Sequence, residues 1–313
     1  MVSKEQISEA HDRISQYIHK TPILTSSLLN EVSGCNLFFK CENFQKIGAF
    51  KIRGAMNAAL QLPPDKLLNG LATHSSGNHA QAIALAAKLL NTKAYIVMPD
   101  NSPEVKINAV KGYGAEITFC KPNLKTREDT MNTVLNRTRA EFIHPYNDER
   151  IIAGQATCGK ELIEDTELLD FVIAPVGGGG LLSGTSLSAK YFGNNITVYA
   201  GEPEGAADAV LSFKSGKVES APFIDTIADG LLTTLGDITL NIIKENVKDI
   251  LLVNDNEIIS AMKMIYERMK IVIEPSAAVP LAVVLKNKEM FSRKNAGLIL
   301  SGGNVDLRIF SII

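Results

Sequence analysis

The sequence has few cysteines, and none of them form a recognisable pair. Cys35, Cys41, Cys120 and Cys158 are scattered along the chain, without a C-x-x-C motif or the spacing of metal ligands. The five histidines show no H-x-x-x-H or H-E-x-x-H arrangement. A zinc site is therefore not expected, and reduced thiols in the cytoplasm are the default interpretation.

An excess of one charge and long apolar runs are also missing. The formal net charge is -2, and no basic, aromatic-rich stripe indicates a surface for nucleic acid. The N-terminus lacks the apolar segment of a signal peptide, and Glu274, Pro275 and Pro280 interrupt the longest apolar stretch. We expect a cytoplasmic protein that binds neither nucleic acid nor membrane.

What the sequence does have is apolar material for a large core, arranged in alternating strands and helices. With 313 residues, 45% of them hydrophobic, it should form about two domains. The patterns predict strands at 37–41, 71–75, 94–98, 116–120, 171–176, 196–201, 250–253 and 297–300, and helices at 50–60, 78–90, 103–112, 127–142, 152–162, 182–192, 257–269 and 276–285. Such alternation predicts an α/β fold with two open, mostly parallel sheets.

The middle of the chain is a compact run of βα units, which suggests a division into two domains. We expect residues 69–146 to form a small domain, and residues 1–68 together with 147–313 to form a large one. Ligands of parallel sheets bind beyond the carboxyl ends of the strands. Three segments that directly follow predicted strands therefore become candidate sites: residues 75–79, 177–180 and 301–304.

The most informative of these segments is a run of four glycines. Gly177, Gly178, Gly179 and Gly180 follow a predicted strand and precede Leu181, at the start of a predicted helix. Amide N–H groups can converge on a phosphate there, and the helix N-terminus adds its positive end. A glycine run can also be an ordinary loop, but its place between strand and helix favours a phosphate site.

A nucleotide is the first candidate for the owner of this phosphate. A P-loop needs Gly-Lys-Ser/Thr after the glycines, and the sequence has Leu181-Leu182-Ser183 instead. Glu202 ends the next strand roughly where an acid that binds a ribose would lie, yet G-x-G-x-x-G fails in every frame. A nicotinamide-dependent dehydrogenase is therefore disfavoured.

A phosphorylated cofactor that is attached to a lysine is the second candidate. Lys51 lies beside Phe50 among small and aromatic residues. Partial desolvation there would lower the pKa of the amine and make it a nucleophile for an aldehyde. Taken alone, a lysine at a helix start is usually a solvated surface charge, so this assignment needs support from elsewhere in the chain.

That support is a resemblance to a known family. Residues 42–55 resemble the pyridoxal-phosphate lysine motif of fold-type II enzymes, whose fold is like that of the tryptophan synthase β subunit. The family's other signatures are similar, in the same order, to residues 75–79, 177–180 and 301–304, with further matches at 228–230 and 274–276. The subgroup that the whole chain resembles contains serine racemases, threonine and serine dehydratases, and threo-3-hydroxyaspartate dehydratases.

The resemblance implies a role for each cofactor-binding residue. Lys51 would bind the aldehyde of pyridoxal phosphate and move the Cα proton of the substrate on one face. The amides of residues 177–180 and Leu181 would hold the phosphate, and Asn78 would bond the phenolic oxygen. Ser301 would bond the pyridine nitrogen; a hydroxyl makes the ring a weaker electron sink than a carboxylate would, which suits β-elimination or racemisation.

The resemblance also implies which residues meet the substrate. The loop of residues 75–79 would bind the substrate carboxylate and close as the small domain moves, and Arg127 would lie near the outer end of the substrate. The residues of this loop are Ser75, Ser76, Gly77, Asn78 and His79. Asn78 and His79 could also cap the helix that they open, and the two functions are compatible.

Ser76 is the residue that best separates racemases from dehydratases. Racemisation needs an acid or base on the face opposite Lys51, and the racemases that this chain resembles use a serine there. Many threonine dehydratases have alanine at this position, although threo-3-hydroxyaspartate dehydratases also resemble the chain there. Tyr146 instead favours a dehydratase, because racemases can have asparagine at its position.

The same subgroup has a metal site and, in some members, an ATP site. Glu202, the carbonyl of Ala206, and Asp208 match the metal ligands, which suit magnesium, calcium or manganese; surface carboxylates at a helix start are the alternative. The residues that match ATP contacts are Ser26, Ser27, Lys46, Gln81, Tyr113, Lys270 and Asn304. Ile47 and Leu28 depart from that pattern, so activation by ATP is doubtful.

Together these features predict a pyridoxal-phosphate enzyme that acts on small hydroxy amino acids. The main hypothesis is a serine racemase that also acts by β-elimination on L-serine or L-threonine and forms pyruvate or 2-oxobutyrate with ammonia. The alternative is a dedicated dehydratase (ammonia-lyase) for threonine or threo-3-hydroxyaspartate. A cofactor-binding protein without turnover should lack Lys51 or Ser76, and both are present. The resemblance also implies a homodimer.

Overall fold

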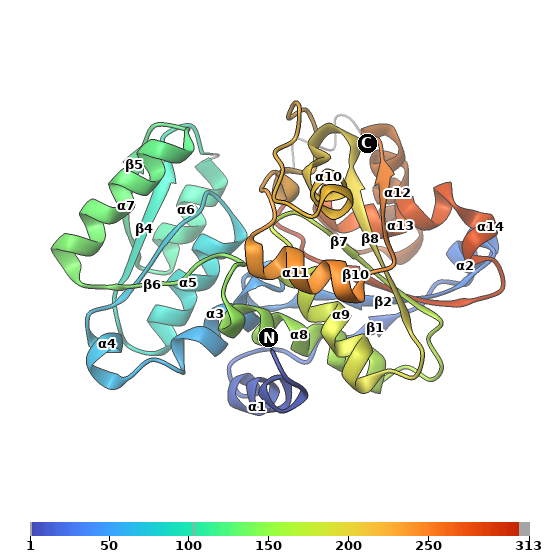
Figure 1. Ribbon diagram of the computed structural model, residues 1–313, viewed down its shortest axis with the longest axis horizontal. Helices are drawn as coiled ribbons and strands as arrows, with labels where there is room; N and C mark the ends of the chain where they lie inside the picture. Colours follow the sequence, from blue (N-terminus) through green and yellow to red (C-terminus); the bar gives the residue numbers. More distant parts are fainter. Residues whose placement is uncertain (1, 103, 307–313) are drawn as a thin grey trace.

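The computed structural model describes residues 2–102 and 104–306 of the chain. Their strands form two separate sheets, one of six strands and one of four. Figure 1 shows the four-stranded sheet with α5, α6 and α7 on the left, and the six-stranded sheet with most of the other helices on the right. We call residues 71–142, which hold the four-stranded sheet, the small lobe, and the other described residues the large lobe.

The six-stranded sheet forms the centre of the large lobe. Its strands, in spatial order, are β1 (Ile23–Leu24), β2 (Asn36–Cys41), β10 (Asn295–Leu300), β7 (Phe171–Pro175), β8 (Thr197–Pro203) and β9 (Asp249–Val253). Every neighbouring pair is parallel except β1 with β2. The predicted α/β fold with mostly parallel sheets is confirmed. Because five strands run the same way, their carboxyl ends meet at one edge.

The small lobe contains four parallel strands. In spatial order they are β5 (Glu116–Cys120), β4 (Ala94–Pro99), β3 (Leu71–His74) and β6 (Glu141–Phe142); the helices between them are α5 (Asn78–Leu89), α6 (Glu104–Gly112) and α7 (Leu124–Thr138). The predicted helix 127–142 is wrong at its end, because Arg139 takes a left-handed conformation (φ 60°) and the chain then pairs with β3. No glycine marks this stop in the sequence. The predicted start of α6 at residue 103 lies outside the described residues.

Most helices belong to the large lobe. Their bounds are α1 (Lys4–Ile14), α2 (Ser27–Ser33), α3 (Lys51–Ala59), α4 (Pro64–Leu68), α8 (Glu149–Glu164), α9 (Gly180–Phe192), α10 (Asp208–Ser215), α11 (Asp237–Asn246), α12 (Asp255–Met269), α13 (Pro275–Lys286) and α14 (Lys288–Phe291). Short 3₁₀ helices are η1 (Glu42–Phe44), η2 (Lys46–Gly48), η3 (Glu204–Ala206) and η4 (Asp229–Leu231). Among the described residues, no helix has the length and apolar character to cross a membrane.

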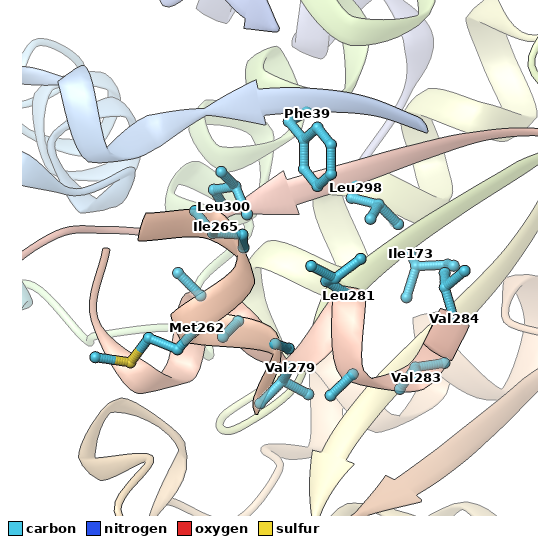
Figure 2. Close-up of a cluster of buried hydrophobic side chains, with 14 of the residues drawn as sticks. Phe39, Ile173, Met262, Ile265, Val279, Leu281, Val283, Val284, Leu298 and Leu300 are labelled. Atoms are coloured by element: carbon cyan, nitrogen blue, oxygen red, sulfur yellow. The ribbon is translucent and has the colours of Figure 1, made fainter. Parts of the chain in front are cut away.

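Helices cover both faces of the six-stranded sheet, as its alternating buried side chains require. Ile173 of β7 and Leu298 of β10 point to one face, where they pack with α12 and α13 (Figure 2). Val172 and Ile299, one position away on the same strands, belong to a second cluster with α8 and α9. The sheet is therefore held from both sides, and its carboxyl edge is a firm support for the loops that follow the strands.

Candidate active site

Lys51 is the first residue of α3 and is half-buried. Its Nζ donates a hydrogen bond to the carbonyl oxygen of Pro145 at 3.0 Å and lies 5.1 Å from the centre of the Phe50 ring. Burial lowers the pKa of Lys51 to about 8, and the charge of Glu274 opposes this shift. About a tenth of the amine is therefore unprotonated at pH 7, far more than for an ordinary lysine, and a nucleophile for an aldehyde must be unprotonated.

The four glycines form the turn from β7 into α9. Gly179 is the N-cap of the helix and has a left-handed backbone (φ 84°), which glycine adopts without strain. A Cβ on Gly178 would overlap the ring of Tyr146, and one on Gly177 would lie 2.9 Å from Cα of Leu231. Only glycine fits this turn, and it presents bare backbone at the N-terminus of a 13-residue helix. This geometry suits a phosphate group.

The loop of residues 75–79 joins β3 to α5 at the carboxyl end of the small sheet. Residues 75–78 are half-buried, and α5 begins at Asn78 after Gly77, without a side-chain cap. The Nδ2 of Asn78 donates to both carboxylate oxygens of Glu274, each at 3.0 Å. Asn78 therefore reaches across to the large lobe, and the alternative that its side chain caps the helix is wrong.

Glu274, which immediately precedes α13, is a site residue for which no role was predicted. It is buried, and burial raises its pKa to about 7 although the hydrogen bond from Asn78 opposes the shift. Asn304 donates to Oδ1 of Asn78 at 2.9 Å and to the carbonyl of Ile47 at 2.7 Å. These bonds join both lobes at one point. Only the match of residues 274–276 to the family pattern pointed to this position.

Ser301 follows β10 and is 3% exposed. Its carbonyl accepts a hydrogen bond from the N–H of Phe50 at 3.1 Å. Gly302, the next residue, forms an antiparallel bridge with Ala49. The end of β10 is thus tied by its main chain to the segment that carries Lys51, although 250 positions separate the two in the sequence.

His79 and Arg127, both predicted to meet the substrate, have different surroundings. His79 is buried, its Nε2 lies 3.2 Å from the carbonyl of Ile143, and burial lowers its pKa well below the usual value. Its imidazole is therefore a neutral, structural group. Arg127 is half-buried on α7, and its Nε has no hydrogen-bond partner among the described residues. A guanidinium in this state is suited to receive an anion.

The predicted metal ligands lie beyond the end of β8. Glu202 and Asp208 are 1% and 2% exposed, and Ala206 ends η3 between them. Glu202 accepts hydrogen bonds from two backbone N–H groups, whereas Oδ2 of Asp208 has no partner in the described part of the chain. Burial raises the pKa of Glu202 to about 8 and that of Asp208 to about 7. Residues 2–102 and 104–306 contain no cluster of three His, Cys, Asp or Glu side chains for a metal, but two carboxylates and a carbonyl fit a hard cation.

Fold and site together define a class, the α/β enzymes that hold a phosphorylated cofactor at the carboxyl edge of a parallel sheet. The chain belongs to one family of this class, described as pyridoxal-phosphate dependent enzymes, which matches residues 14–302. The protein is thus an enzyme that depends on pyridoxal phosphate. The half-buried Lys51 and the glycine turn fit this cofactor.

Some similar proteins are named serine racemases, and others are named dehydratases. The chain is 50% identical to a serine racemase of Dictyostelium discoideum, over 100% of this chain and 98% of that protein. It is 49% identical to a beta-hydroxyaspartate dehydratase of Paracoccus denitrificans, over 97% of this chain and 96% of that protein. The structure of maize serine racemase superimposes with a TM-score of 0.96 at 43% identity, over 99% of this chain and 96% of that chain.

Proposed function

We propose that the enzyme racemises serine and also converts L-serine to pyruvate and L-threonine to 2-oxobutyrate, each with release of ammonia; the water lost in β-elimination is taken up again when the imine is hydrolysed. The observation that carries the proposal is the lowered pKa of Lys51. This lysine lies near Glu274, and a main-chain hydrogen bond joins its neighbour Phe50 to Ser301. Bound pyridoxal phosphate would supply an electron-withdrawing ring that weakens the Cα–H bond of the amino acid. The resemblance to serine racemases supports the choice of serine.

The residues of the chain divide the work between the two faces of the substrate. Lys51 would hold the cofactor aldehyde and then take the Cα proton on one face, and Ser76 would give or take a proton on the other. The backbone of residues 75–79 would bind the substrate carboxylate. The amides of residues 177–181 would hold the phosphate, Asn78 the phenolic oxygen, and Ser301 the ring nitrogen. We further propose that residues 69–146 move as a domain to close the site.

A second function is favoured by one observation, the unpartnered Nε of Arg127. A guanidinium binds a second carboxylate well, and threo-3-hydroxyaspartate carries one where serine has only hydrogen. The enzyme would then act chiefly as a threo-3-hydroxyaspartate ammonia-lyase that forms oxaloacetate and ammonia. The resemblance to a beta-hydroxyaspartate dehydratase supports this candidate.

The proposal includes a divalent cation and a homodimer. Magnesium or calcium would bind Glu202, Asp208 and the carbonyl of Ala206, because both carboxylates are buried and Oδ2 of Asp208 has no hydrogen-bond partner among the described residues. The family resemblance supports a homodimer, and the scattered, unpaired cysteines support a cytoplasmic location.

A product assay tests the function directly. Enzyme loaded with pyridoxal phosphate is given L-serine, L-threonine or threo-3-hydroxyaspartate, and D-serine, pyruvate, 2-oxobutyrate and oxaloacetate are measured. The wild type should form D-serine and pyruvate, Lys51→Ala should form neither, and the exposed control Lys190→Ala should match the wild type. Activity of Lys51→Ala in both reactions would remove the lysine from the mechanism, and turnover of threo-3-hydroxyaspartate alone would establish the second candidate.

A further inference from the structure

His144 lies where the chain crosses from the small lobe to the large lobe, between β6 and α8 (Figure 1). Its Nδ1 accepts hydrogen bonds from two backbone N–H groups, that of Tyr146 at 3.2 Å and that of Asn147 at 2.8 Å. A ring nitrogen that accepts two N–H groups carries no proton, so the imidazole is neutral with its proton on Nε2. Burial also lowers the pKa of His144 to about 4.

The turn that His144 organises contacts three parts of the site. The carbonyl of Pro145 accepts the hydrogen bond from Lys51, and the ring of Tyr146 covers Gly178. Oδ1 of Asn147 accepts a hydrogen bond from the N–H of Ile238 at 3.0 Å, at the start of α11. The position of this turn therefore affects the Lys51 amine, the glycine turn and the start of α11.

One peptide group links the histidine to the lysine. The carbonyl that accepts from Lys51 and the N–H that Tyr146 donates to His144 belong to the same planar unit, the peptide between Pro145 and Tyr146. In a trans peptide the C=O and the N–H point in opposite directions. Nδ1 of His144 on one side thus fixes the direction of the carbonyl on the other side.

We propose that His144 is a positioning residue for Lys51: by accepting the N–H of this peptide, it aims the Pro145 carbonyl that holds the lysine amine ready for the cofactor aldehyde. The proposal rests on the proposed role of Lys51. Proline has no N–H, so residue 145 cannot itself donate a bond that would fix the turn. The acceptor of His144 orients this peptide from its N–H side.

The test compares acceptor with non-acceptor side chains at residue 144. Asparagine can accept the N–H group two residues on with Oδ1, as in an Asx turn, whereas leucine and alanine cannot accept at all. Apoprotein of each variant is mixed with pyridoxal phosphate, the adduct is trapped with borohydride at timed intervals, and the modified Lys51 peptide is quantified by mass spectrometry. His144→Leu should slow attachment about tenfold, as the loss of one hydrogen bond permits, and His144→Asn should stay within about threefold of the wild type.

Controls separate this effect from misfolding and from failure of the proposed function. His74→Leu removes a neighbouring imidazole that makes no bond to the Pro145–Tyr146 peptide, and it should change the attachment rate less than about twofold. If the leucine variant does not fold, His144→Ala takes its place, and ¹⁵N NMR of the wild type should show an unprotonated Nδ1. Equal rates for the leucine, alanine and wild-type proteins, or a protonated Nδ1, would overturn the role of His144. No attachment at Lys51 in the wild type would instead overturn the proposed function.

Discussion

The two lobes hold their polar groups in different ways. In the large lobe, one cluster of charged side chains is buried and paired: Arg53 of α3 bonds Glu42 and Glu161 at 2.7 Å each, and Lys40 bonds Glu161 at the same distance. In the small lobe, the ion pair of Arg137 with Glu116 is exposed. An apolar cluster joins the lobes where α3 packs on α5, but at the site their contacts are polar.

This difference matches the division of labour in the proposed mechanism. Groups that must stay fixed, such as Lys51 and the glycine turn, belong to the lobe with paired buried charges. Residues 75–78 belong to the other lobe, where Asn78 bonds Glu274 of the large lobe and Lys106 of α6 forms an ion pair with Asp229. Contacts of this kind can form and break as the site opens and closes, because each is individually weak.

The largest effect on stability should come from breaking the buried network. Arg53→Met leaves Glu42 and Glu161 with one cation, Lys40, so a buried carboxylate loses its partner. The free energy of unfolding in urea should fall by about 3–5 kcal/mol. The exposed Arg137→Met in the small lobe is the control, with an expected loss below about 1 kcal/mol. Similar losses for both variants would contradict the contrast between the lobes.

Ser76→Ala tests the side of the site that belongs to the small lobe. Without this hydroxyl, racemisation of serine should drop by about 100-fold or more, since a positioned acid or base is lost. Elimination needs proton removal only on the face of Lys51 and should fall less than about tenfold. Ser75→Ala, which changes the neighbouring hydroxyl, should affect both reactions alike. Equal losses in Ser76→Ala would mean that this serine only shapes the loop.

The buried carboxylates of Glu202 and Asp208 predict a cation effect that depends on pH. Without metal their pKa values are raised, from 4.5 to about 8 and from 3.8 to about 7. A raised pKa contributes stability that is complete below the unfolded value and is lost as the pH rises through the folded value. The Tm of chelated protein should therefore fall between pH 6 and pH 8, and magnesium should raise it more at pH 8 than at pH 6.

The double variant Glu202→Gln, Asp208→Asn is the control for this effect. Its Tm should no longer respond to magnesium, because the amides do not carry the charge that holds a hard cation. A magnesium response of equal size in this variant, or one that is stronger at pH 6 in the wild type, would place the cation elsewhere.

The smallest effect is expected at the ion pair between the lobes. Lys106 pairs with Asp229, whose side chain is 46% exposed, so water and salt screen the pair. Asp229→Asn should lower the free energy of unfolding by less than about 1 kcal/mol and raise KM for the amino acid by less than about fivefold. The change in KM should shrink in high salt. A stability loss as large as that of Arg53→Met would show that the lobes are locked together rather than loosely joined.

The sequence predicted best those strands that are buried on both faces. The predicted strands end at 75, 176 and 300, and the structure has β3, β7 and β10 ending within one residue of each. The loops after these strands could also be predicted, because a polar or glycine-rich segment follows each strand. The helix expected from residue 182 begins at Gly180, since glycines in a first turn give no helical signal.

What the sequence could not predict depends on contacts between distant residues. The bond from Asn78 to Glu274 joins side chains 196 positions apart, and no local pattern encodes it. The two-residue strands β1 and β6 are too short for a periodic signal, so they exist only through their partners. The roles of Lys51, Ser76 and the metal ligands stay predictions.

The overlap between Gly178 and Tyr146 constrains how this enzyme can vary. The tyrosine ring occupies the volume that any larger residue at 178 would need, so a change at 178 requires a smaller side chain at 146 first. The reverse order is possible, because a smaller residue at 146 does not collide with Gly178 and leaves room for water above the turn. Evolution between related activities can therefore begin at 146 and reach 178 only afterwards.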